Sequence, residues 1–63
     1  MTSHLNADDI YRSINAGENA AWKCINRKNV NELITIATKN GNRSLELKLN
    51  VFIKLITAPE FLH

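Results

Sequence analysis

The stretch "TKNGNRSLELKLNVFIKLIT", residues 38–57, decides the fold of this chain. Asn40 and Gly41 stand between two apolar segments, and Asn-Gly in that position is the strongest short-range signal for a β-hairpin. The same pair is also typical of a helix end, where glycine takes the left-handed conformation just after the last helical residues. The flanking segments therefore decide between a hairpin and two helices.

The segment after the turn, "LELKLNVFIKLI" (residues 45–56), fits both patterns in part. As a strand it alternates apolar and polar residues, but Phe52 and Ile56 fall on the polar side. As a helix it has one narrow polar stripe, and only Lys48 lies outside that stripe. It is about twice as long as an average strand, and Pro59 follows where a helix stops. These features favour a helix with a polar stripe formed by Arg43, Glu46, Asn50, Lys54 and Thr57.

The segment before the turn, "NVNELITIATKNG" (residues 29–41), predicts a helix on its own evidence. Its apolar side chains gather on one side at about 100° per residue, whereas a strand divides them between two faces. Asn29 and Glu32 have the spacing of a capping box, in which two side chains cap the first turn of a helix. The apolar side consists of Val30, Leu33, Ile34 and Ala37, with Ile36 at its edge.

Two more helices are expected nearer the N-terminus. In "NADDIYRSINAG" (residues 6–17), Asn6 suits the N-cap and Gly17 the C-terminal stop. Ile10 and Ile14, four residues apart, form its apolar stripe. In "ENAAWKCINRK" (residues 18–28), Trp22 points toward the core. The sequence thus predicts one all-α domain over residues 1–63, a bundle of three to four short helices with loosely packed tails at 1–5 and 59–63. An α+β fold with a hairpin at the Asn-Gly pair is the alternative.

The helix after the turn has more apolar surface than one neighbour can cover. Its apolar arc takes about two thirds of the circumference, far wider than a single packed face requires. A chain of 63 residues buries only about 60% of the surface of its unfolded form. A symmetric homodimer is the commonest way to cover the excess, and a central place within its own bundle is the alternative. We expect a dimer interface formed by Leu45, Leu49, Phe52, Leu55 and Ile56.

No residue pattern in this sequence specifies catalysis, a cofactor or a metal site. His4 and His63 lie at opposite ends of the chain, and Cys24 is the only cysteine, so the spacing of a zinc site is missing. Asp8 and Asp9 are explained by the positive end of a helix dipole. We therefore expect no catalytic residues, no cofactor, no metal and no enzymatic activity.

The remaining features predict binding to another macromolecule. Partner contacts are expected from Trp22, Lys23, Arg27 and Lys28 on one side and from Phe61 and Leu62 on the other, in the style of a helix docked into an apolar groove. A nucleic acid held by a basic helix face of Lys23, Arg27 and Lys28 is the alternative. The net charge of +2 makes that alternative electrostatically weak.

The single cysteine predicts a reducing, cytoplasmic location. No secretory signal is expected, because the start "MTSHLNADDIYRS" has no basic head followed by an apolar core. No membrane contact is expected either, since no uncharged apolar run approaches the ~18 residues of a membrane span.

As a whole, the chain resembles a known family. Its length, its start "MTSHLNADDIYRSINAGENAAWK" (residues 1–23) and its end "ITAPEFLH" (residues 56–63) are similar to the 63-residue open-reading-frame protein of lambdoid bacteriophages. That protein is encoded in the early region, between the exonuclease and excisionase genes. The resemblance implies a small helical protein in the cytoplasm of the bacterial host. It also implies an accessory role that modulates host physiology and the choice between lysis and lysogeny. We expect this role to act through binding to an unidentified host protein.

Overall fold

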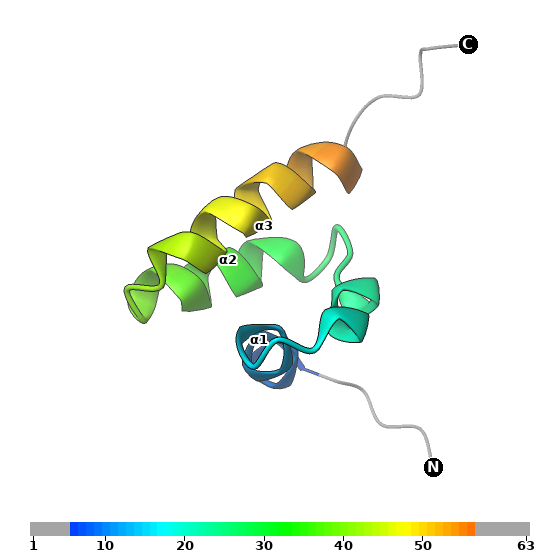
Figure 1. Cartoon of the computed structure of the whole chain (residues 1–63). Helices are drawn as coiled ribbons and strands as arrows, with labels where there is room; N and C mark the ends of the chain where they lie inside the picture. The colour runs from blue at the N-terminus through cyan, green and yellow to red at the C-terminus, as the bar shows by residue number, and fades with distance from the viewer. Residues whose placement is uncertain (1–5, 57–63) are drawn as a thin grey trace, which may run out of the picture.

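The computed structural model describes residues 6–56, which form three α-helices and one 3-10 helix (Figure 1). Helix α1 spans Ala7–Asn15, the 3-10 helix η1 spans Asn19–Cys24, α2 spans Val30–Lys39 and α3 spans Arg43–Ile56. No strand occurs between residues 6 and 56. The predicted all-α fold is confirmed, and the alternative hairpin at the Asn-Gly pair is wrong. The predicted tails, 1–5 and 59–63, lie outside the described residues.

Helix α2 lies in the middle of the molecule. On one side it packs against α1, and on another side α3 runs back along it in the opposite direction (Figure 1). The short η1 packs against α1, close to the point where α2 begins. Because α3 has its main contact with α2 alone, only one side of α3 faces the core.

The Asn-Gly pair ends α2 rather than turning a hairpin. Gly41 has a φ of +67°, the left-handed conformation that glycine adopts without steric cost. Its N–H donates to the Thr38 carbonyl at 3.0 Å, and the Asn42 N–H donates to the Ala37 carbonyl at 2.9 Å. These two bonds form a Schellman motif, which satisfies carbonyls that a helix end otherwise leaves unpaired.

The predicted boundaries of α1 are also confirmed. The Asn6 side chain accepts a hydrogen bond from the Asp9 N–H at 2.9 Å, as an N-cap does. At the other end Gly17 has a φ of +89°, and the Glu18 N–H donates to the Ser13 carbonyl at 3.0 Å. Both glycines of the chain thus follow a helix in the left-handed conformation.

The predicted capping box at the start of α2 is wrong by three residues. Asn29 makes no side-chain cap of α2. Instead, the Asn26 Oδ1 accepts from the Lys28 N–H (2.8 Å) and the Asn29 N–H (3.1 Å), while the Asn29 Oδ1 accepts from the Asn26 N–H at 2.9 Å. The reciprocal pair is therefore Asn26 and Asn29, which has the same spacing as the pair predicted with Glu32.

The second predicted helix, over residues 18–28, is shorter and tighter than expected. It forms only the 3-10 helix Asn19–Cys24, and Ile25 after it has an extended backbone. The hydrogen bonds around Gly17 end α1, and the capping pair Asn26 and Asn29 begins the next helical turn. Too few residues lie between Gly17 and Asn26 for a stable α-helix, and the tighter 3-10 form suits such short segments.

The core gathers the predicted apolar stripes of all three α-helices. Trp22, expected to point into the core, is only partly buried, and Cys24 is also partly buried. The buried residues are Ala7, Ile10, Tyr11, Ile14, Ile25, Val30, Leu33, Ala37, Leu45 and Leu49.

The Asn42 side chain connects the start of α3 to α1 by hydrogen bonds. Its Oδ1 accepts from the Leu45 N–H (3.2 Å), and its Nδ2 donates to the Tyr11 hydroxyl (3.1 Å) and the Asn15 Oδ1 (2.9 Å).

Candidate interaction surfaces

Three large apolar side chains lie exposed in a row along α3. Leu47, Val51 and Leu55 are 53%, 60% and 70% exposed. They are four residues apart, so they follow one ridge of the helix. We call these three residues the outer stripe. A contiguous apolar row rimmed by polar residues is typical of an interaction site, whereas single exposed apolar residues are not.

The outer stripe lies on the side of α3 that points away from the core. At 3.6 residues per turn, Val51 is turned roughly 160° from Leu49, whose side chain is fully buried. The main contact of α3 is with α2, while α1 packs against α2 and η1. Leu47, Val51 and Leu55 stay exposed, so α3 has more apolar surface than the fold of residues 6–56 covers, as the sequence predicts.

The outer stripe has cations along both edges. Lys48 lies about 60° to one side of Val51, and Lys54 lies about 60° to the other side, with Arg43 beyond it. All three side chains are exposed, and within residues 6–56 none of them forms an ion pair. Glu46, the single carboxylate of α3, is partly buried and lies toward the inner side. The surface is thus an apolar row between positively charged edges.

The predicted dimer interface needs a correction at two positions. Leu45 and Leu49 are buried in the core of the single chain. They contact other residues of the same protomer, so in this fold they have no surface to offer a second copy. Phe52 and Ile56 are partly buried, and only Leu55 is largely exposed. A homodimer remains a prediction, and in this fold it would use the outer stripe.

Trp22 and Phe52, predicted on two separate surfaces, contact each other. Their ring centroids are 5.3 Å apart and the rings are tilted by 59°, a favourable geometry for an aromatic pair. Both rings pack against the edge of the core and stay partly exposed. The pair therefore joins η1 to α3, and its first role is structural.

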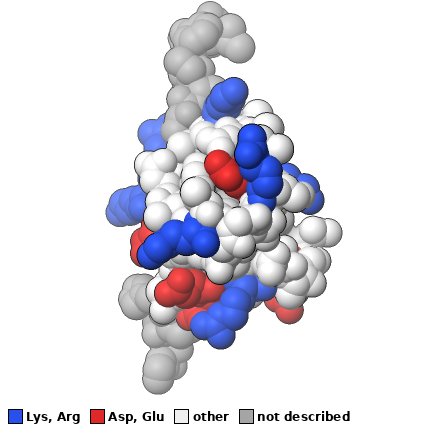
Figure 2. All heavy atoms as spheres, turned by 90° about the vertical axis from the view of Figure 1, so that its left-hand side faces the viewer, with Lys and Arg blue, Asp and Glu red and all other residues white. Residues whose placement is uncertain are grey.

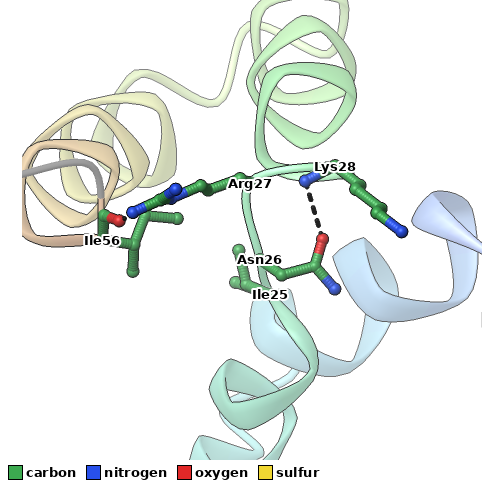
Figure 3. Close-up of a pocket in the computed structure, with 5 residues that line it drawn as sticks. All are labelled: Ile25, Asn26, Arg27, Lys28 and Ile56. Carbon is green, nitrogen blue, oxygen red and sulfur yellow. Dashed lines mark hydrogen bonds between the residues drawn. The ribbon is translucent and has the colours of Figure 1, made fainter.

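An open pocket of about 490 Å³ lies between the start of α2 and the end of α3 (Figure 3). Ile25, Asn26, Arg27, Lys28 and Ile56 line it. The Arg27 Nε donates to the Ile56 carbonyl at 3.0 Å, so this guanidinium stands at the C-terminal end of α3, where the helix dipole favours a cation. Figure 3 shows Arg27 pointing toward Ile56 and Lys28 pointing the opposite way.

The basic residues predicted as one contact face are therefore spread out. Lys23 lies on η1, and Arg27 and Lys28 lie in the turn after it with side chains in opposite directions. Over the side of the molecule drawn in Figure 2, Lys and Arg are likewise scattered, with Asp and Glu and uncharged residues between them. The two other predicted contact residues, Phe61 and Leu62, lie outside the described residues.

Comparisons with family models, curated proteins and solved structures find no match to this chain. Within residues 6–56, no three His, Cys, Asp or Glu side chains come together in a group that could hold a metal ion. No helix in the described part of the chain is both long enough and apolar enough to cross a membrane.

Sequence reasoning missed Leu47 and Val51 as surface residues, although a signal was present. Leu45, Leu49, Phe52 and Ile56 are spaced by four, three and four residues, a pattern that stays on one side of an α-helix and is typical of a packed seam. Leu47, Val51 and Leu55 are spaced by four and four, so the row turns slowly around the helix. The first set forms the inner face, and the second is left outside.

Proposed function

We propose that this protein is a non-enzymatic accessory protein of a lambdoid bacteriophage that acts by binding a protein of the bacterial host. The contact surface is the outer stripe of α3. Binding there modulates host physiology and the choice between lysis and lysogeny, in the cytoplasm of the host. The phage setting rests on the resemblance of the sequence, and the binding mode rests on the fold.

The observation that supports binding is the exposure of Leu47, Val51 and Leu55, each more than half exposed in the same row. Each large apolar side chain moved from water into a contact stabilises a complex by roughly 1.5–3 kcal/mol when fully buried. Three such residues on a firmly packed helix form a surface that needs little ordering before it binds, which lowers the entropic cost of association.

A nucleic acid is the second candidate partner, and the fold favours it less. The Arg27 guanidinium already donates to the Ile56 carbonyl, and the Lys28 side chain points away from it. Phosphate binding is strongest where several cations face the same backbone. Nuclease treatment separates this candidate from the protein partner.

The experiment is affinity capture of the tagged full chain from bacterial lysate, with and without nuclease, using three forms of the protein. The wild type is compared with Val51→Asp, which places a carboxylate in the middle of the outer stripe. Asn50→Asp is the matched control, because it places the same charge on the same helix at an exposed position off the stripe. Circular dichroism first verifies that all three are equally helical.

We expect one host protein to be retained in stoichiometric amount by the wild type and by Asn50→Asp, before and after nuclease. Val51→Asp should lose it. If Val51→Asp retains the host protein as well as the control does, the outer stripe is not the contact surface. Loss of all bound material on nuclease treatment would assign the function to nucleic-acid binding instead.

A further inference from the structure

We infer that the occupant of the outer stripe is an acidic amphipathic helix, a segment with an apolar row flanked by Asp or Glu. This inference rests on the proposed function and adds the chemistry of the partner. It is argued from the shape of the stripe and from the charges on its two edges.

The shape of the outer stripe fits a helix. Leu47 and Leu55 are eight residues apart, a distance of about 12 Å along the axis, or just over two turns. A partner helix that presents apolar residues at i, i+3 or i+4, and i+7 covers the same length. The row is one side chain wide, so it forms a ridge that packs into the groove beside such a row on another helix.

The charge of the edges specifies an acidic partner. Lys48 on one side and Lys54 with Arg43 on the other are exposed, and none forms an ion pair within residues 6–56. The one carboxylate of α3, on Glu46, lies toward the inner side and is partly buried. A partner with carboxylates beside its apolar row therefore finds an opposite charge on both edges, which favours the correct partner and speeds association.

A second copy of this chain fits the same edges poorly. Both edges of the outer stripe are cationic, so a two-fold pair places lysines beside lysines whether the two α3 helices run parallel or antiparallel. Like charges brought together at an interface oppose association. The charge pattern thus favours a different protein over the homodimer.

An anionic membrane surface is also a poorer occupant than a helix. Helices that lie in a membrane surface insert a broad apolar face, commonly with Trp or Phe. The outer stripe is narrow and aliphatic, since Leu47, Val51 and Leu55 are its only members. Phe52, the one aromatic residue of α3, is paired with Trp22 and packs against the core.

The test uses two synthetic helical peptides that differ only in their edges. Both have Leu at i, i+4 and i+7 on an Ala-rich background; one has Glu at the flanking positions and the other has Lys. Binding to the full chain is measured by fluorescence anisotropy at about 0.05 M and about 0.5 M salt. We expect the Glu peptide to bind at least about tenfold more tightly than the Lys peptide at low salt. The higher salt concentration should reduce this difference in affinity, because it screens the charges.

A charge-swapped protein provides the matched control. In the double variant Lys48→Glu/Lys54→Glu, both substituted positions are exposed and lie off the core, so the fold is retained. Its preference should invert toward the Lys peptide. Val51→Asp should bind neither peptide.

Several outcomes would overturn the inference. One is equal binding of the two peptides, and another is an unchanged preference in the charge-swapped protein. A dimer in sedimentation that Val51→Asp dissociates would assign the outer stripe to a second copy. Binding to phosphatidylglycerol vesicles without binding to the Glu peptide would assign it to lipid.

The proposed function and this inference fail in distinguishable ways. If Val51→Asp loses the captured host protein but the wild type shows no preference for the Glu peptide, the stripe binds a partner of another chemistry and only the inference fails. If the Glu peptide binds as expected but Val51→Asp still captures the host protein, the inference about the stripe stands and the proposed function fails.

Discussion

Truncating two leucines of α3 that are only two residues apart tests which side of the helix is inside. Leu49→Ala removes a side chain that is 0% exposed, whereas Leu47→Ala removes one that is 53% exposed. The two substitutions are chemically identical and occur in the same helix. Any difference in their effect on the free energy of unfolding therefore reports on packing alone.

The expected magnitudes are far apart. A fully buried leucine cut back to alanine loses its transfer free energy and leaves a cavity, which together destabilise by about 3–4 kcal/mol. A half-exposed leucine has no cavity to leave and loses less than about 1 kcal/mol, and the better helix propensity of alanine offsets part of that. A domain of this size has a total stability of roughly 3–5 kcal/mol. Leu49→Ala should thus be largely unfolded, and Leu47→Ala should unfold close to the wild type.

The assay is urea denaturation followed by far-UV circular dichroism at protein concentrations from about 5 to 100 μM. If Leu49→Ala is too unstable for a full curve, Leu49→Met gives a smaller loss of up to about 1.5 kcal/mol that stays measurable. Equal losses for the two alanine variants would contradict the orientation of α3. A loss at Leu49 that shrinks as the protein concentration rises would place this residue in a dimer interface instead of the core.

Three further substitutions test the ends of the helices, all by urea denaturation. Gly41→Ala should destabilise by about 1 kcal/mol, because its φ of +67° is unfavourable for a residue with a Cβ. No steric clash adds to this loss, since nothing lies within 4 Å of the added carbon. Gly41→Asn should cost less, and no loss of stability in either variant would contradict the Schellman motif. Asn26→Ala should cost about 1 kcal/mol and Glu32→Ala nearly nothing; the reverse order would restore the capping box expected from the sequence. Asn42→Ala should cost about 1–2 kcal/mol, since it removes the cap of α3 and two hydrogen bonds to α1, whereas Asn42→Ser retains the cap and should lose less.

Much of the fold could be predicted because local signals agreed with one another. Asn6 and Gly17 mark the two ends of α1 in the sequence, and the structure uses both as expected. The Asn-Gly pair was ambiguous on its own, but the helical pattern before it decided the matter. The end of a helix is determined by a few neighbouring residues, so it can be predicted without knowledge of the tertiary contacts.

The start of α2 shows where local signals compete. Asn26 and Asn29 have the same spacing as Asn29 and Glu32, so the sequence offers two capping boxes in overlapping registers. The structure uses the earlier one, in which the Asn29 Nδ2 also donates to the Cys24 carbonyl at 3.0 Å. That extra hydrogen bond forms only because η1 places the Cys24 carbonyl beside Asn29. The spacing of capping residues in the sequence gives no information about that position.

The exposed apolar surface of α3 was predicted in kind but not in place. The width of the apolar arc on α3 correctly indicated apolar surface that the fold of residues 6–56 leaves exposed. Which part of the arc is exposed depends on where α2 lies, and no single-helix pattern gives that position. The residues with the best seam spacing, Leu45 and Leu49, were predicted for a partner chain, but the core of the same chain buries them first.

The second apolar face of α3 serves no purpose within the described fold. A helix packed on one side requires one apolar face, and Leu45, Leu49, Phe52 and Ile56 already provide it. Replacing all of the outer stripe by glutamine should therefore leave the free energy of unfolding within about 1 kcal/mol of the wild type, as measured by urea denaturation, while it abolishes capture of the host protein. If stability falls along with binding, the stripe contributes to the fold after all. If only binding falls, the three side chains belong to the interactions of the protein and not to its folding.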